Sequence, residues 1–202
     1  SEDAAEAERL LRPHLEGAPD DDEALGLLGV ARDAQRRHTD AERAFVRAIE
    51  LSRDETSLAF LLLDAAEASL SLRQPASAAE RIERALATGV LEGEERFAAR
   101  LALAEALLEC GEAERARAAL EQALASGEGD GEEHAVAEEL LADALFGMGA
   151  LDEADAGYAR VIAAGGDVAA EARAHLGRAR VADEKDDSEA ARAHGERARD
   201  AC

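Results

Sequence analysis

The sequence repeats itself at an interval of 38 residues. Three segments, 75–89, 112–127 and 151–165, align without gaps, and four sets of matching positions recur in them. The four sets are Ala78, Ala116 and Ala154; Ile82, Leu120 and Tyr158; Ala85, Ala123 and Val161; and Gly89, Gly127 and Gly165. A chain with such a period has to stack its copies, because one copy alone cannot bury its apolar face.

Each copy predicts two amphipathic helices joined by a polar turn. In the second helix, apolar residues fall at i, i+4 and i+7, which is one face of a helix. The closing glycine is expected to adopt the left-handed conformation that ends many helices. Thr39, Ser57 and Asp167 are expected to cap helix N-termini. Alanine is abundant, aromatic residues make up 2% of the chain and β-branched runs are absent, so we expect helices almost throughout.

The repeated positions resemble the tetratricopeptide repeat family. That family has a large residue and Leu-Gly in its first helix, and Ala, a bulky aromatic and Ala in its second. The clearest match is formed by Leu25, Leu28-Gly29, Ala41, Phe45 and Ala48. The resemblance covers nearly the whole chain. It implies an all-α fold, a right-handed superhelical solenoid of stacked antiparallel helix pairs.

We expect a single repeat domain over residues 1–202. Within it we expect the second helix of a truncated repeat at 1–20, repeats at 22–55, 59–92, 97–130 and 135–168, and a degenerate or capping repeat at 170–202. The later repeats, at 37 or 38 residues, should be about one helical turn longer than the usual 34. Because the chain opens inside a region that matches a second helix, we expect a fragment of a longer chain.

The formal net charge of −23 argues against nucleic acid, which needs a basic surface, and against anionic membranes. No signal peptide is evident and no apolar run approaches the length of a membrane span, so direct membrane insertion is not expected. With only two cysteines, Cys110 and Cys202, a reducing, cytoplasmic setting is predicted. Arginine is common and lysine occurs once, at Lys185, a composition typical of a high-GC bacterial genome.

Residues that could carry chemistry are scattered. The five histidines, His14, His38, His134, His175 and His194, do not stand at a metal-ligand spacing. The run 128–133 alternates acid and glycine like a calcium loop but lacks the closing bidentate Glu. Nucleophile motifs and phosphate-binding glycine loops are missing. We therefore expect no enzyme activity, no metal and no cofactor.

In the family that the chain resembles, the first helices of successive pairs line a concave face. The positions that this implies here are Val30, Asp33, Phe60, Leu63, Glu67, Leu70, Leu101, Glu105, Leu108, Glu139, Leu140, Asp143 and Phe146. Glu67, Glu105 and Asp143 are again 38 residues apart, one turn from apolar residues. Such a groove suits a basic or amphipathic partner. The alternative is that its apolar members are ordinary packing between helices.

None of these positions is Lys, Arg or Asn, which the family's binders of C-terminal carboxylates use, so an acidic peptide is not expected. Three functions stay open. The first is a scaffold or adaptor that binds a partner protein or peptide in the acidic-apolar groove. The second is a regulatory or peptide-sensing module of a larger signalling protein or enzyme. The third is a structural spacer or self-assembling array. The partner's identity, the biological process and the oligomeric state do not follow from the sequence.

Overall fold

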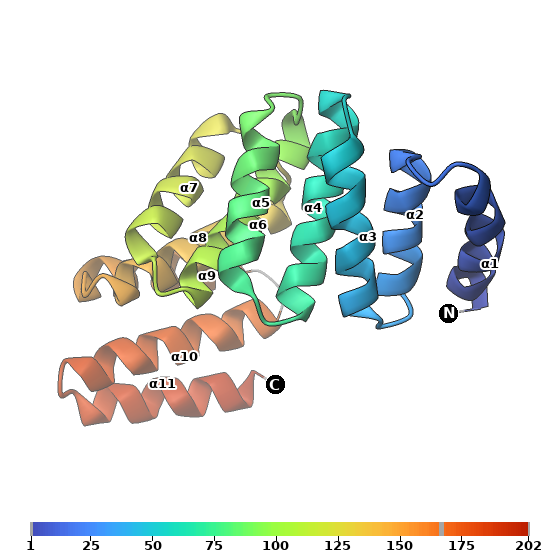
Figure 1. Ribbon diagram of the computed structural model, residues 1–202. Helices are drawn as coiled ribbons and strands as arrows, with labels where there is room; N and C mark the ends of the chain where they lie inside the picture. The colour runs from blue at the N-terminus through green and yellow to red at the C-terminus, as the bar shows by residue number, and fades with distance from the viewer. Residues whose placement is uncertain (1, 166–167, 202) are drawn as a thin grey trace. The chain divides into compact units, whose positions relative to one another are not determined.

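The structure, a computed structural model, describes residues 2–165 and 168–201, and within these ranges every regular element is an α-helix (Figure 1). The chain divides into two compact units, unit 1 (Ser1–Glu92) and unit 2 (Gly93–Cys202). Unit 1 contains α1 (Glu2–Gly17), α2 (Asp22–Asp33), α3 (His38–Leu51), α4 (Glu55–Ser71) and α5 (Pro75–Ala87). Unit 2 contains α6 (Gly93–Glu109), α7 (Ala113–Ser126), α8 (Gly131–Gly147), α9 (Leu151–Ala164), α10 (Val168–Glu184) and α11 (Ser188–Asp200). The predicted all-α helical repeat fold is confirmed.

Within each unit, every helix packs against the next helix along the chain. A second set of contacts joins alternate helices: α2 contacts α4 in unit 1, and α8 contacts both α6 and α10 in unit 2. We call α2, α4, α6, α8 and α10 the first helices, because each begins a helix pair. Each unit therefore has a layer of first helices that touch one another directly, backed by the second helices.

The extra length of the later repeats lies in the first helix of each pair. The first helix α2 has 12 residues, whereas α4, α6, α8 and α10 have 17 each. The added residues come at the N-terminus, since α4 begins at Glu55 and α6 at Gly93, before the expected repeat starts. The predicted extra turn is thus found, and it extends the layer of first helices.

Helix ends agree with the predicted glycine caps but not with the predicted N-caps. Gly127 and Gly165 both have φ of 68° and close α7 and α9 in the left-handed conformation. Thr39 lies inside α3 rather than at its cap. Ser57 also lies inside its helix, because Asp54 caps α4 by accepting the Ser57 backbone N–H at 2.8 Å. The remaining predicted cap, Asp167, is outside the described residues.

The turn between the two helices of a pair contains one residue with positive φ. In unit 1 this residue is Arg36 (58°) after α2 and Arg73 (59°) after α4. In unit 2 it is Gly111 (75°), Gly149 (77°) and Asp186 (59°). Glycine adopts this conformation without the steric cost that a Cβ brings. Unit 1 therefore carries a local strain at its turns that two of the three turns in unit 2 avoid.

One aromatic ring on a second helix fills the core of unit 1. Phe45 of α3 is 1% exposed and packs among small residues of α3 and α4. The close approach of α2 to this ring requires glycine at position 29. A Cβ on Gly29 would lie 2.6 Å from a ring carbon of Phe45, which no real contact tolerates.

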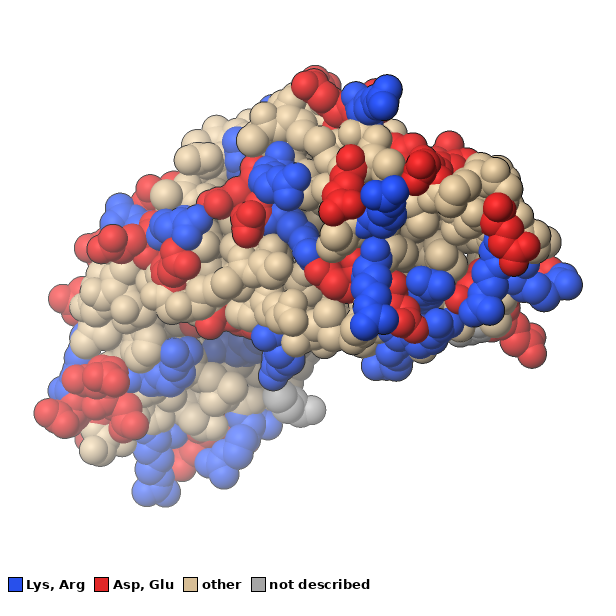
Figure 2. Space-filling model, in the orientation of Figure 1, with Lys and Arg blue, Asp and Glu red and all other residues tan. Residues whose placement is uncertain are grey.

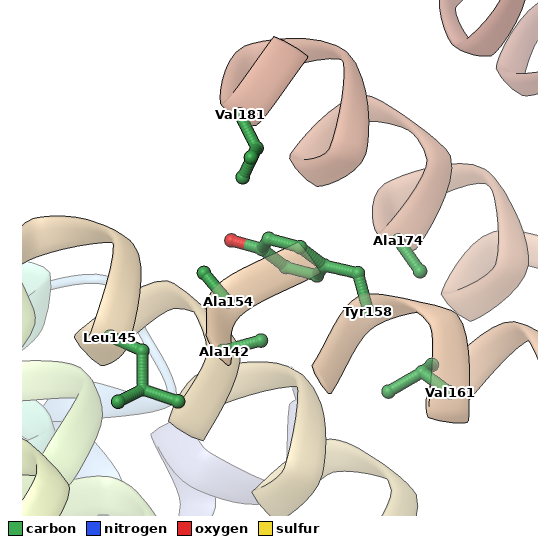
Figure 3. Close-up of a cluster of buried hydrophobic side chains, with 7 residues drawn as sticks. All are labelled: Ala142, Leu145, Ala154, Tyr158, Val161, Ala174 and Val181. Atoms are coloured by element: carbon green, nitrogen blue, oxygen red, sulfur yellow. The ribbon is translucent and has the colours of Figure 1, made fainter. Parts of the chain in front are cut away.

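In unit 2 a tyrosine contributes a buried aromatic ring to the core. Tyr158 of α9 is 1% exposed, and Figure 3 shows it with Ala142 and Leu145 of α8, Ala154 and Val161 of α9, and Ala174 and Val181 of α10. Here the glycine that receives the ring is Gly177 of α10, whose Cβ would collide with the tyrosine ring. Ring and glycine thus come from consecutive pairs, whereas in unit 1 both come from one pair.

A buried carboxylate ties α1 to the first complete pair. Glu8 of α1 is 5% exposed. It accepts hydrogen bonds from Arg37 at 2.6 Å, Arg12 at 2.9 Å, Gln35 at 3.2 Å and Arg32 at 3.3 Å. These donors, Arg12 foremost, lower its pKa to about 2. Hydrogen bonds and ion pairs of Glu8 therefore join α1 to α2 and to the turn that follows α2.

Candidate partner-binding site

An open cleft of about 280 Å³ lies between the first helices α2 and α4 of unit 1. Three large apolar side chains in it are unusually exposed: Leu27 (53%), Val30 (45%) and Phe60 (41%). Gly26 lets α4 come close to α2, since a Cβ there would lie 2.5 Å from Leu61 Cδ2. Several exposed apolar side chains that adjoin one another, with polar residues around them, are typical of an interaction site.

Acidic side chains surround this cleft, which we call the α2–α4 cleft. Asp22, Glu23 and Asp64 line it directly. The pKa of Asp64 is raised, first because burial removes water from the carboxyl group and then because Glu67 and Asp33 lie near it. His38 is 2.7 Å from Asp33. No lysine or arginine of the described chain pairs with Asp64, so the negative charge of the cleft is uncompensated.

Some acids elsewhere on unit 1 are paired with arginine. Figure 2 shows Lys and Arg side chains beside Asp and Glu side chains over much of the face in view. On the second helix α3, Arg47 lies 2.7 Å from Asp20, and Glu42 pairs with Arg81 of α5. Unlike these paired acids, Asp64 in the α2–α4 cleft has no lysine or arginine partner among the described residues.

The first helix α8 of unit 2 carries acids that are paired within the chain. Glu139 is 9% exposed and accepts a fork of two hydrogen bonds from Arg173 of α10, at 2.7 and 2.9 Å. Asp143 accepts a 2.6 Å hydrogen bond from the Tyr158 hydroxyl and lies 3.3 Å from Arg180. Burial, and then this bond to Asp143, raises the pKa of Tyr158. Arginines of α10 thus neutralise Glu139 and Asp143.

The same helix places a guanidinium on an aromatic ring. Arg180 lies with its Cζ 4.3 Å from the centroid of the Phe146 ring, while one of its amino groups contacts Asp143. Phe146 and Asp143 are three residues apart on α8 and therefore share a face. A cation held between a ring face and a carboxylate is a strong arrangement for arginine.

The predicted binding residues of α6 include both an acid that is unpaired among the described residues and leucines that are largely buried. Glu105 is exposed, yet its pKa is raised, first because the surrounding chain displaces water and then because Glu109 is near. Leu101 is 9% exposed and Leu108 is half-buried. No base of the described chain neutralises Glu105.

The thirteen predicted binding residues therefore fall into three groups. The exposed ones are Val30, Phe60, Glu67 and Glu105. The half-buried ones are Asp33, Leu63, Leu70, Leu108, Leu140, Asp143 and Phe146. Leu101 and Glu139 are buried, the first in helix packing and the second in its ion pair with Arg173, so the expectation of an open groove position does not hold for these two. Binding by the others stays a prediction.

Several residues of the site were absent from the predicted set. Leu27 and Asp64 line the α2–α4 cleft. Arg173 and Arg180 pair with acids 34 and 37 residues away in sequence. The helical spacing of Leu27 to Val30 and of Phe60 to Asp64 is a signal that could have found the first two. Nothing local in the sequence marks the two arginines.

Two of the histidines meet. His175 of α10 and His194 of α11 are both buried, and their Nδ1 atoms are 3.3 Å apart. The pKa of each is lowered, first by burial, which disfavours the charged form. Within the described residues, no group of three or more His, Cys, Asp or Glu is placed to hold a metal ion. Over the same residues, no helix combines the length and apolarity that crossing a membrane requires.

The acidic glycine run has a structural use. Asp130 caps α8 by accepting the backbone N–H groups of Glu132 and Glu133, each at 2.9 Å, and the Glu133 carboxylate accepts the Asp130 backbone N–H at 3.0 Å. Glu128 pairs with Arg96. This reciprocal cap is a sufficient reason for acids at these positions.

Comparisons with known proteins agree with this architecture. The family model of the tetratricopeptide repeat matches residues 1–56 and 63–131. BtubC from P. vanneervenii is 20% identical, with a TM-score of 0.75, over 98% of this chain and 88% of that chain. YrrB, described as a TPR protein with an unusual peptide-binding site, is 19% identical, with a TM-score of 0.71, over 95% and 91%. PilF of Pseudomonas aeruginosa is 20% identical, with a TM-score of 0.66, over 96% and 82%.

A comparison with curated protein sequences gives no match. At these identities, the solved structures establish the fold and nothing further. The family model covers more than half of the residues, and its matched segments include the whole of the pairs α2–α3 and α6–α7. The chain therefore belongs to the tetratricopeptide repeat family.

Proposed function

We propose that the protein is an interaction scaffold whose first helices bind a basic or amphipathic segment of a partner protein. The observation that carries this proposal is the α2–α4 cleft, where exposed Leu27, Val30 and Phe60 adjoin carboxylates that no described base neutralises. Apolar contact supplies affinity, and the unpaired acids favour a cationic partner over an acidic one. The peptide-binding site named for the similar protein YrrB is consistent with this use of the fold.

The test is site-specific photocrosslinking in a lysate of the native cell. The photoreactive amino acid benzoylphenylalanine replaces Phe60 of α4 in one protein and Val46 of α3 in the other. The two positions are 41% and 40% exposed, so they are matched in accessibility and differ in the layer to which they belong. We expect position 60 to crosslink a partner through a basic or amphipathic segment, identified by mass spectrometry, and position 46 to crosslink far less of it.

Crosslinking through position 46 alone would show that the second helices carry the interaction, and the proposal would be wrong. Salt provides an independent check. Because exposed charges are screened over about 8 Å at physiological ionic strength, the crosslinked yield should fall as salt rises. A yield that salt leaves unchanged would remove the electrostatic part of the proposal.

A further inference from the structure

Unit 2 contains an arginine site built on a first helix and filled by its own chain. Asp143 and Phe146 of α8 share one face, and Arg180 of α10 occupies it. The guanidinium lies 4.3 Å from the Phe146 ring centroid, and Nη1 lies 3.3 Å from Asp143 Oδ1. Both contacts favour arginine over lysine, because a planar guanidinium stacks on a ring while it bonds to a carboxylate.

Unit 1 carries the same two kinds of side chain without the cation. Phe60 and Asp64 are four residues apart on α4, so they too share a face, and both line the α2–α4 cleft. The order along the helix is reversed relative to Phe146 and Asp143, which changes the direction of approach but not the chemistry. Asp33 and Glu67 add negative charge around Asp64.

The apolar half of the cleft limits what else can enter. Leu27, Val30 and Leu61 lie beside Phe60, in a space of about 280 Å³. This volume is at the lower end of small-molecule pockets, and it is open to the surface. It accommodates one or two side chains of a bound segment but not a large cofactor.

We propose that the α2–α4 cleft binds an arginine side chain of a partner protein, with its guanidinium between Phe60 and Asp64 and a neighbouring apolar side chain of the same segment against Leu27 and Val30. This deepens the scaffold function and rests on it. The partner segment presents Arg and an apolar residue on one side, as an amphipathic helix does at a spacing of three or four residues. The partner's arginine then occupies a place like that of Arg180 in unit 2.

The proposal is tested with synthetic peptides. The probe is a twelve-residue helical peptide of Ala and Gln that carries one Leu and one Arg four positions apart. Matched peptides replace Arg by citrulline, which keeps the shape and removes the charge, or by Lys, or replace Leu by Ala. Binding is followed by NMR through the Leu27 and Val30 methyl groups and the Phe60 ring. We expect citrulline to weaken binding by about tenfold and lysine by a smaller factor.

Two protein variants separate the cleft from general acidity. Asp64→Asn removes one charge inside the cleft, and Glu80→Gln removes one from an exposed position on α5. We expect the first to lower affinity for the arginine peptide about tenfold and the second to leave it unchanged, with circular dichroism equal for all. Equal affinity for arginine and citrulline peptides, retention of affinity in Asp64→Asn, or no shift at Phe60 would each overturn the proposal.

The two proposals fail in different ways. If position 60 crosslinks a partner but the arginine peptide does not bind, the scaffold function stands and the arginine site is wrong. If crosslinks come only from the second helices, the proposal that the first helices bind the partner is wrong, whatever the peptides show. A crosslinked segment that carries Arg next to an apolar residue would support both.

Discussion

Unit 1 and unit 2 are built from the same helix pairs, yet they place charge differently. Unit 1 buries the carboxylate of Glu8 among arginines at its first pair and leaves Asp64 unpaired on the first-helix face. Unit 2 pairs Glu139 and Asp143 with arginines of α10, and its buried polar groups at the last pair are the neutral side chains of His175 and His194. The difference shows that one fold can leave acids of its first helices unpaired or pair them with arginines of its own chain.

The largest expected effect concerns the buried carboxylate of unit 1. Glu8→Gln keeps the size of the side chain but removes the charge that Arg12, Arg32 and Arg37 share. We expect a loss of about 2 kcal/mol in the free energy of unfolding of unit 1, since hydrogen bonds to charged groups contribute about 1.5–3 kcal/mol. Hydrogen exchange of α1 and α2 amides measures it.

The stability that Glu8 provides should also depend on pH. The pKa of Glu8 is lowered to about 2, so its stabilisation is complete above the ordinary value of 4.5 and is lost as pH falls toward 2. Glu6→Gln, on the exposed side of α1, is the control. The Arg9 hydrogen bond lowers the pKa of Glu6 as well, so this variant should lose a small part of the acid dependence, well below the loss in Glu8→Gln. An equal loss in the two variants would mean that the network around Glu8 does not hold α1.

The histidine pair of unit 2 should respond to a different pH range. The pKa values of His175 and His194 are lowered, so below pH 6.5 the unfolded chain takes up protons that the folded one resists. The flanking charges are Glu171, Arg197 and Arg178 near His175, and Arg178, Arg197 and Asp155 near His194. Stability of α10 and α11 should therefore decrease as pH falls from 6.5, by less than the Glu8→Gln effect.

Amide exchange at pH 7.5 and 5.5, corrected for intrinsic rates, distinguishes the two units. Over this range the amides of α11 should exchange faster at the lower pH. The exchange rates of α2 should not change, because the pKa of Glu8, about 2, lies far below pH 5.5. His194→Phe removes one imidazole at similar size and should reduce the pH dependence of α11 exchange. Equal pH dependence in the two proteins would show that the pair does not control it.

Removing the internal arginine should make unit 2 resemble unit 1. Arg180→Ala removes the cation from Phe146 and Asp143, while the Tyr158 hydrogen bond to Asp143 remains. We expect the arginine peptide then to shift Phe146 resonances that it leaves unchanged in the original protein. The stability cost should stay below about 1 kcal/mol, because Arg180 is exposed and exposed ion pairs contribute little. No new shift at Phe146 would mean that ring and carboxylate alone do not make an arginine site.

The smallest expected change in stability is at Arg73, in a turn of unit 1. Arg73→Gly should stabilise unit 1 by about 0.5 kcal/mol, since relief of the positive φ slightly exceeds the added freedom of the unfolded chain. The reverse change in unit 2, Gly149→Ala, should destabilise by about 1 kcal/mol. Thermal unfolding of both variants checks the pair. Destabilisation by Arg73→Gly would show that the Arg73 side chain makes contacts that matter more than the strain.

The sequence was sufficient for the fold because the repeat constrains it in several ways at once. The 38-residue period predicted the helix pairs, and glycines at its end predicted the left-handed caps at Gly127 and Gly165. The N-caps Thr39 and Ser57 were wrong because several polar residues cluster before each helix. At α4 the N-cap is Asp54, three residues before the predicted Ser57, so the helix begins about one turn earlier than expected.

The site was less predictable because it depends on which helices become neighbours. Phe60 and Val30 could be placed on a common face from helical spacing, and both are exposed in the α2–α4 cleft. The pairing of Glu139 with Arg173 depends on the angle at which α10 crosses α8, which no local pattern specifies. His175 and His194 meet for the same reason, across the turn between α10 and α11.

The ring-and-glycine packing decides where this chain tolerates recombination. Phe45 and Gly29 belong to one helix pair, so duplication or exchange of residues 22–51 would carry both partners together. Tyr158 and Gly177 belong to successive pairs, so a crossover between α9 and α10 would set a tyrosine against whatever residue the donor has at position 177. An exchange of the first pair would thus keep its ring and its glycine together, whereas an exchange of the last pair alone would separate them.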